Sequence, residues 1–124
     1  MAGKIVADTL EHSTAGSIAT NYVVNGSAKG WCSFDGTAGT PTFNDSFNGS
    51  SITDGGTGDQ TMNLTNAMTD ANYPASFLGN ARSQFGTPTG SHPSASGCQI
   101  RSTNTSDSNA DNSFVQIIFH GDLA

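Results

Sequence analysis

The sequence predicts an all-β protein, an antiparallel β-sandwich of jelly-roll type, and three observations support this fold class. Charged residues make up 11% of the 124 residues and hydrophobic residues 34%, and 15 residues are glycine. This composition disfavours helices, because Gly, Ser, Thr and Asn prefer strands, turns and caps. Several short segments alternate apolar with polar residues, and clusters of Gly, Asn, Asp and Pro separate these segments. We therefore expect about seven short strands.

A chain of 124 residues is expected to form one domain with a single core. Residues 1–27 place Ile5, Val6 and Leu10 among polar residues without sustained periodicity, which predicts an extended N-terminal docking arm. Residues 28–124 are then the sandwich domain. Because the hydrophobic fraction is low, we expect copies of the chain to bury surface against each other or against a larger body.

The first two strands are predicted from AKGWCSFD and TFNDSFN. In AKGWCSFD, Cys32 and Phe34 share one face while Trp31 lies on the opposite face, away from the expected core. TFNDSFN offers Phe43 and Phe47 to a short second strand.

The next segment, SITDGGTGDQTMNL, combines a glycine cluster with an alternating run. Its glycines suit either a ligand loop or a hairpin turn, and Asp54 with Asp59 offers oxygen donors for a cation. A phosphate loop is excluded because no lysine and no helix follow. Met62 alternates with polar neighbours, as in a half-buried strand, which favours the turn. We expect a hairpin loop of three to five residues with positive φ at Gly55, Gly56 and Gly58.

The second half of the chain predicts three more strands. A strand ending near Leu78 should lie at a sheet edge because it contains Pro74. The long aperiodic loop 81–97 is of a length that usually carries function, and CQIRST then resumes a strand. The closing SFVQIIFH has apolar residues on both faces, which predicts a strand covered on both sides; these residues are Val115, Ile117 and Phe119 on one face and Phe114 and Ile118 on the other.

The two cysteines, Cys32 and Cys98, lie too far apart in sequence for a zinc or thioredoxin-like motif. We expect buried free thiols, with a disulfide as the alternative, because no secretory signal is recognisable. A net charge of −6 with few basic residues argues against nucleic acid binding. No apolar run is long enough for a membrane span, so a soluble protein is expected.

No enzymatic activity and no cofactor are expected. His12, His92 and His120 lie in separate segments, and no nucleophile elbow or metal-binding helix surrounds them. The single glutamate, together with aspartates in turns, makes a glycosidase pair improbable.

Calcium is the strongest ligand hypothesis. Asp107, Asn109 and Asp111 alternate like the first donors of an EF-hand loop, but the sixth position is Asn112 and no glutamate stands at position 118. An Asx-rich turn that satisfies its own backbone is the favoured interpretation.

The aromatic residues Trp31, Tyr22, Tyr73 and Phe85 could stack on sugars, as in a carbohydrate-binding module with Trp31 and Tyr73 in one groove. An outward Trp31 suits a subunit interface equally well, and we favour the interface.

Two runs resemble a family of bacteriophage virion proteins, which occur as the carboxy-terminal part of tail fibres and as small structural proteins of phages of aquatic bacteria. The first run, Lys29–Thr37, is similar to a family pattern Lys-Ala-Trp-Val-x-Phe-Asn-Gly-Thr. The second, Asp45–Thr61, follows the family closely, and its departures are Gly49, Gly55 and Gln60. Looser similarity extends over residues 28–120.

The resemblance implies a non-enzymatic protein of the virion surface, made in the bacterial host cytoplasm and assembled as a homotrimer with capsid or tail proteins. Because the chain begins with its own arm and has no shaft, we expect a capsid decoration or cement protein. A tail fibre or tail tip that binds a host-surface glycan is the alternative, and a carbohydrate-binding module is a more distant one. The expected interface residues are Ile5, Val6, Leu10, Trp31, Phe114 and Ile118.

Overall fold

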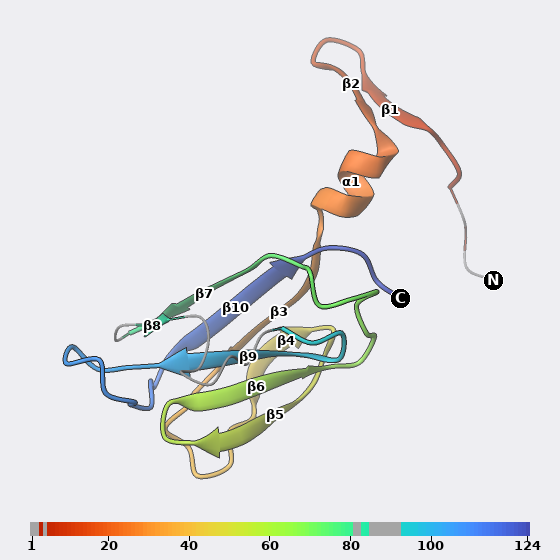
Figure 1. The fold of residues 1–124 in the computed structure, drawn as a ribbon. Helices are drawn as coiled ribbons and strands as arrows, with labels where there is room; N and C mark the ends of the chain where they lie inside the picture. Colours follow the sequence, from red (N-terminus) through yellow and green to blue (C-terminus); the bar gives the residue numbers. More distant parts are fainter. Residues whose placement is uncertain (1–2, 4, 81–82, 85–92) are drawn as a thin grey trace.

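The computed structural model of the chain describes residues 3, 5–80, 83–84 and 93–124. The described chain is mostly β-strand in antiparallel pairings with one short helix, so the all-β prediction is confirmed. Figure 1 shows two layers of strands, with a hairpin and the helix beyond one end of them. No helix in these described ranges combines the length and apolar character that crossing a membrane requires.

Two four-stranded antiparallel sheets build the main body. Sheet I has the order β4-β3-β10-β7, made of β4 (Phe43–Phe47), β3 (Ala28–Phe34), β10 (Val115–His120) and β7 (Ala75–Gly79). Sheet II has the order β5-β6-β9-β8, made of β5 (Gly49–Gly56), β6 (Asp59–Leu64), β9 (Gly97–Ser102) and β8 (Ser83–Gln84). The chain passes from sheet I to sheet II directly after β4, at Asn48, whose φ is 59°.

The core lies between the inner faces of the two sheets. Alternation in the strands decides which side chains enter it, as expected for half-buried strands: Phe34 and Phe119 come from sheet I and Met62 from sheet II, all fully buried. Gly30 leaves room for the Phe119 ring, since a Cβ at Gly30 would lie 2.0 Å from Cζ of that ring. The buried apolar residues are Cys32, Phe34, Met62, Met68, Tyr73, Cys98, Ile100, Val115, Ile117 and Phe119.

The glycine cluster forms the β5–β6 hairpin, so the turn interpretation holds. The last register pair, Gly56 with Asp59, leaves a loop of two residues, and the expected length of three to five is wrong. A bulge between Asp54 and Gly56 places the extra residue, Gly55, in the strand. Positive φ is needed only at Gly56 (111°) and Gly58 (71°).

The N-terminal segment is more ordered than an extended arm. It contains a hairpin of β1 (Thr9–His12) and β2 (Gly16–Ala19) followed by helix α1 (Thr20–Gly26). The hairpin turn is held by His12 Nδ1, which accepts from the backbone N–H of Thr14 and Ala15 at 3.3 and 3.1 Å. Strands of four residues are too short for alternation to be recognised in the sequence, which is why the prediction missed them.

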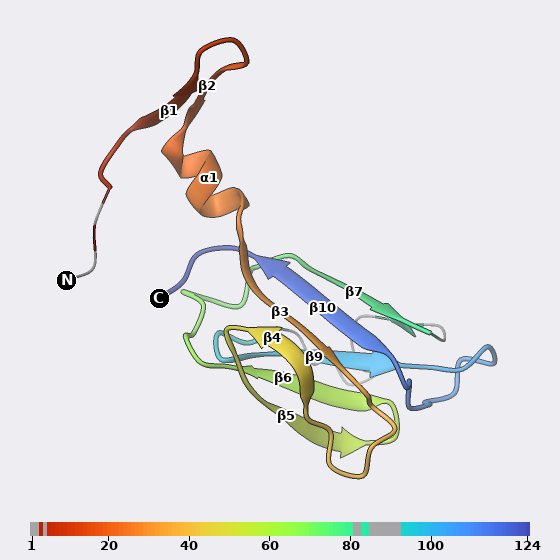
Figure 2. The same cartoon turned by 180° about the vertical axis from the view of Figure 1, so that it is seen from behind.

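Helix α1 contributes no residue to the core, and none of its residues is buried. Lys29 fixes its end to sheet I by donating from Nζ to the carbonyl of Val24 and to Ser27 Oγ. Residues 5–26, which we call the N-terminal unit, stand beyond the end of β3 in both views (Figures 1 and 2).

The second half of the chain agrees with the sequence in part. β7 begins directly after Pro74 and lies at the edge of sheet I, as expected. Tyr73 belongs to the core instead of an exposed groove: it is 7% exposed, and its hydroxyl donates to the carbonyls of Ser94 and Gly97. Most of the expected loop 81–97 lies outside the described residues, and so do Phe85 and His92.

Cys32 and Cys98 are buried free thiols, as expected. They come from opposite sheets, from β3 and β9. Burial, and secondarily the neighbouring Cys98, raises the pKa of Cys32 from 9.0 to about 12. Burial raises the pKa of Cys98 from 9.0 to about 11. Both thiols are therefore protonated throughout the neutral pH range, and neither is an activated nucleophile.

Replacement of the two positive-φ glycines should separate backbone strain from steric conflict. Gly56→Ala meets no atom within 4 Å, so we expect it to lower the free energy of unfolding by roughly 1–3 kcal/mol through strain alone. At Gly58 a Cβ would lie 2.3 Å from the Ser102 carbonyl oxygen, and Gly58→Ala should lose roughly 1–3 kcal/mol more. Urea denaturation measures both variants, and equal losses would contradict the steric contribution.

The raised thiol pKa values predict a loss of stability in alkali. Above pH 9 the unfolded chain releases its thiol protons while the folded chain keeps them until about pH 11 and 12, so the free energy of unfolding should fall as pH rises. The slope for each thiol rises toward about 1.4 kcal/mol per pH unit, and over the interval from pH 9 to 10 it averages about 1 kcal/mol. Urea denaturation between pH 9 and 10 measures this slope.

The control for the alkaline measurement is the double variant Cys32→Ala, Cys98→Ala. It should be less stable overall but lose less stability per pH unit over the same interval. Equal slopes for the two proteins would show that the thiols do not cause the loss.

Candidate binding surface

The outer face of sheet II is polar and forms its own hydrogen bonds. Asn63 Nδ2 donates to Ser51 Oγ at 2.9 Å and to Thr53 Oγ1 at 2.7 Å. Gln99 Nε2 donates to Asp59 Oδ1 at 2.6 Å. A face of hydroxyl and amide groups that are already paired is suited to solvent and needs no further cover.

The outer face of sheet I is apolar. Five large side chains on it or at its end are exposed: Trp31 by 37%, Phe47 by 52%, Leu78 by 59%, Phe114 by 40% and Ile118 by 41%. The strand register groups them, because Trp31 of β3 lies opposite Phe47 of β4 on one side and opposite Ile118 of β10 on the other. Contiguous apolar surface of this kind marks an interaction site in soluble proteins.

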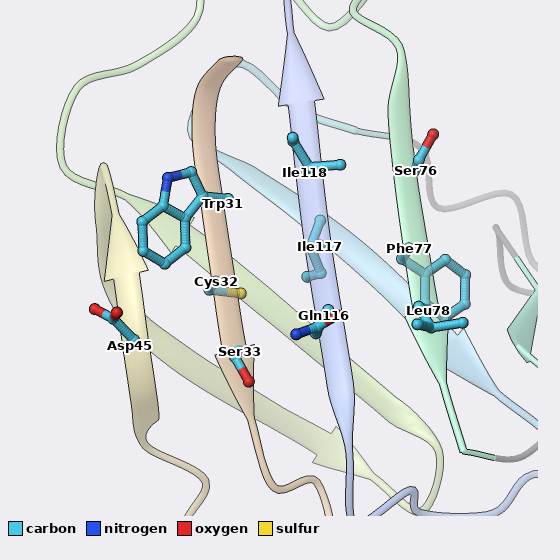
Figure 3. A pocket seen from close by; sticks show the side chains of 10 residues that line it. All are labelled: Trp31, Cys32, Ser33, Asp45, Ser76, Phe77, Leu78, Gln116, Ile117 and Ile118. Carbon is cyan, nitrogen blue, oxygen red and sulfur yellow. The ribbon is translucent and has the colours of Figure 1, made fainter.

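A shallow groove of about 520 Å³ runs over this apolar face. Figure 3 shows Trp31, Ile118 and Leu78 around it, projecting from three neighbouring strands. Ser33 and Gln116 add a hydroxyl and an amide between them, and Asp45 carries the only charge among the lining residues. Such a lining binds a partner by burying apolar area, and it holds no nucleophile paired with a base.

Among the residues that the structure describes, only one side of β10 is covered, whereas the sequence predicts cover on both sides. Val115, Ile117 and Phe119 are buried, whereas Gln116 and Ile118 are exposed. The described chain forms only two layers, and residues 5–26 extend beyond the end of sheet I instead of lying across it (Figure 2). The described part of the chain therefore supplies no cover for the second side of this strand.

The N-terminal unit presents a second apolar surface. A groove of about 490 Å³ lies between the segment before β1 and helix α1, and none of the described residues that line it is charged. Tyr22 and Ile18 are also exposed on this unit, by 68% and 45%. The residues that line the groove are Ile5, Val6, Ala7, Leu10, Thr20, Val23 and Val24.

All the interface residues expected from the sequence are exposed, and they divide between these two surfaces. Ile5, Val6 and Leu10 belong to the N-terminal unit, whereas Trp31 and Ile118 are register partners on sheet I. Phe114 directly precedes β10.

Sequence reasoning missed Phe47 and Leu78 as surface residues. Phe43 and Phe47 are four residues apart, and regular alternation in a strand would place both on the same face. A bulge opposite Ser33 and Phe34 makes Asn44 an extra residue, so Phe43 packs against the core while Phe47 is exposed. Leu78 could have been found from the alternation of Ser76 and Leu78 with the partly buried Phe77.

The two carboxylates of the glycine hairpin accept hydrogen bonds from separate groups of the protein. Asp54 Oδ1 accepts from the backbone N–H of Gly56 at 2.9 Å, while Asp59 Oδ1 accepts from Gln99 at 2.6 Å. One carboxylate closes the turn and the other joins neighbouring strands, so each has a structural role.

The calcium candidates have separate partners as well. Asn109 Oδ1 accepts from Arg101 Nε at 2.6 Å, and Asp111 Oδ1 accepts from the backbone N–H of Gly58 at 2.6 Å. Asp107 lies in the turn with φ 59°, and Asn104 Oδ1 binds the N–H groups of Ser106 and Ser108 as in an Asx turn. Within the described residues no group of three or more His, Cys, Asp and Glu side chains could hold a metal ion.

The expected carbohydrate groove does not form as predicted. It required Trp31 and Tyr73 together, and Tyr73 is buried in the core with its ring 5.5 Å from that of Phe119. Tyr22 is exposed, but on the N-terminal unit.

Comparison with known protein families, with curated proteins and with solved structures found no match.

The two faces of β10 should respond differently to truncation. Ile117 is 2% exposed and Ile118 is 41% exposed, so Ile117→Ala should lower the free energy of unfolding by about 2–5 kcal/mol. Ile118→Ala should change it by less than about 1 kcal/mol under dilute conditions in which the chain is monomeric. Urea denaturation of both variants tests this, and a large loss from Ile118→Ala in the monomer would mean that the chain itself covers this face.

Proposed function

We propose that the protein is a non-enzymatic structural protein of a bacteriophage virion, exposed on the particle surface. In this proposal it is a capsid decoration or cement protein. Residues 1–27 form the arm that docks on neighbouring subunits of the shell, and this docking stabilises the shell. The protein is made in the bacterial host cytoplasm and acts only by adhesion.

The observation that carries this proposal is the contrast between the outer faces of the two sheets. Sheet I exposes large apolar side chains around Trp31 and Ile118, whereas sheet II exposes paired polar groups around Asn63. A protein with one adhesive face and one solvated face suits attachment to a surface. The N-terminal unit adds a second adhesive surface at the end of the molecule.

Homotrimeric assembly and a jelly-roll-like sandwich complete the proposal. Three copies around one axis bury apolar surface that a chain with 34% hydrophobic residues leaves exposed. In this proposal Trp31 and the strand β10 help to form that axis, and the register that pairs Trp31 with Ile118 within the apolar face supports it.

The resemblance to phage virion proteins supports the same role. The run Lys29–Thr37 contains most of β3, and the run Asp45–Thr61 leads from β4 through the hairpin into β6. The first run therefore carries Trp31, and the second carries Phe47, its partner across the strands. The two similar segments therefore contribute Trp31 and Phe47 to the apolar face of sheet I, and the second segment also forms β5 of sheet II.

A tail fibre or tail tip that binds a host-surface glycan is the second candidate, since an adhesive protein suits either end of a virion. The two roles differ in stoichiometry. A decoration protein is present in very many copies on the head, and a tail protein in few copies.

Electron microscopy of virions carrying a labelled form of the protein tests the proposal. We expect label over the whole head in high copy number and loss of head stability in virions that lack the protein. Label confined to the tail would favour the fibre role. Virions without the protein would contradict a structural role of either kind.

A further inference from the structure

A group of polar side chains is buried at the end of the core that adjoins the β5–β6 turn. Gln60 and Asn112 are each 1% exposed, and Ser102 is fully buried. Gln60 of β6 and Ser102 of β9 lie on the inner face of sheet II, because they alternate in step with the buried Met62 and Ile100. Positions inside a core are mostly apolar, so these three polar side chains need an explanation.

Four polar atoms in this group have no hydrogen-bond partner among the described residues, and all four are shielded from bulk solvent. They are Gln60 Oε1, Ser102 Oγ, Asn112 Oδ1 and Asn112 Nδ2. Native proteins satisfy nearly all buried polar atoms, either with protein groups or with ordered water, because an unpaired atom keeps its full desolvation cost. The group therefore offers hydrogen bonds to a small polar ligand.

Asn112 reaches this group through the two residues before it. The backbone N–H of Ala110 donates to the Ser102 carbonyl oxygen at 3.0 Å. Gln60 Nε2 donates to Asp111 Oδ1 at 3.2 Å. Because an ionised carboxylate only accepts, Gln60 directs its Nε2 toward Asp111 and leaves Oε1 for another partner. These two contacts bring the backbone of Asn112 next to both inner-face residues.

Gly36 provides space next to Asn112 and Gln60. It lies two residues beyond Phe34, the last residue of β3 in sheet I, and its N–H donates to the Asn112 carbonyl oxygen at 2.8 Å. A Cβ at Gly36 would lie 3.0 Å from that oxygen and 3.5 Å from Gln60 Oε1. A carbon atom so close to the carbonyl oxygen would be crowded, whereas a water oxygen forms hydrogen bonds at about 2.8 Å. The missing side chain therefore leaves room that a water molecule can use.

The donors and acceptors of the group fit water better than a metal cation. Asn112 presents one N–H donor group and one acceptor oxygen in either orientation of its amide, and a cation binds only the oxygen. Asp111 Oδ1 already accepts from Gln60 Nε2 at 3.2 Å and from the N–H of Gly58 at 2.6 Å. Water can both accept and donate, and an internal water usually has two to four polar partners.

We propose that this end of the core is a binding site for ordered internal water, which joins Gln60, Ser102 and Asn112. The water accepts from Asn112 Nδ2 and donates to Gln60 Oε1, and Ser102 Oγ bonds to it in either role. Because Asn112 lies just before β10 of sheet I and the other two residues lie in sheet II, the water connects the two sheets. It thereby stabilises the fold, and the site is separate from the adhesive role proposed above.

The variant Ser102→Ala tests the site through the sign of its effect on stability. It removes one buried hydroxyl oxygen and leaves the backbone hydrogen bonds of β9 in place. Removal of a hydroxyl that has no partner would leave the protein equally stable or more stable. Removal of a hydroxyl that binds water loses a hydrogen bond, so we expect the unfolding equilibrium constant to rise by roughly 5-fold. Urea denaturation measures this constant.

The matched control is Ser50→Ala in β5, where the side chain is exposed. It should change the unfolding equilibrium constant by about 2-fold or less. Unchanged or increased stability of Ser102→Ala would overturn the inference.

A high-resolution crystal structure of the full-length wild type gives a direct readout. We expect electron density for a water within about 2.7–3.2 Å of both Asn112 Nδ2 and Gln60 Oε1. An ion at about 2.3–2.6 Å from oxygen atoms alone would identify a cation site instead. A direct hydrogen bond between Gln60 and Asn112 would show that the protein groups satisfy each other. Either of these two results would contradict the water site.

Discussion

The structure depends on the burial of two sheet faces against each other around Phe34 and Phe119. Hydrophobic residues make up only 34% of the chain. Most of the large apolar side chains of the strands lie in this core or pack against it. The packing is close: the ring of Phe119 occupies the space that a side chain at position 30 would fill, and Phe119 also packs beside Tyr73. Because interiors are packed at crystal-like density, the sheets have little freedom to shift, and the side chains on their outer faces are held in a fixed register.

That rigid register turns the outer faces into surfaces of defined chemistry. Each strand sends alternate residues inward, so whatever remains must face outward. On sheet II the outward residues satisfy each other, as Asn63 does with Ser51 and Thr53. On sheet I they include large apolar side chains, and the register aligns Trp31 with Ile118. The same two-layer construction that gives the chain its core therefore leaves one face that is energetically unfavourable in water, and the N-terminal unit adds another.

The polar and titratable groups that could have supported chemistry are largely engaged in maintaining the fold. Asp111 accepts from Gly58 and joins the last long loop to the hairpin. His12 holds the turn of its own hairpin, and the thiols are buried and protonated at neutral pH. What the described surface offers freely is apolar area. This distribution is the reason why we propose adhesion as the activity of the protein.

Local sequence patterns determined the strands of the main body and the position of the β5–β6 turn, but they did not predict the β1–β2 hairpin or helix α1. Tertiary structure decided which faces remained open. Alternation identified the inward sides of β3 and β10 because a half-buried strand requires a period of two. The glycines identified the β5–β6 turn because few other residue types adopt a positive φ. The exposure of Ile118, the bulge at Asn44 that separates Phe43 from Phe47, and the burial of Tyr73 depended on neighbours distant in sequence. A strand with apolar residues on both faces specifies that both can be buried, but only the number of layers in the folded chain decides whether they are.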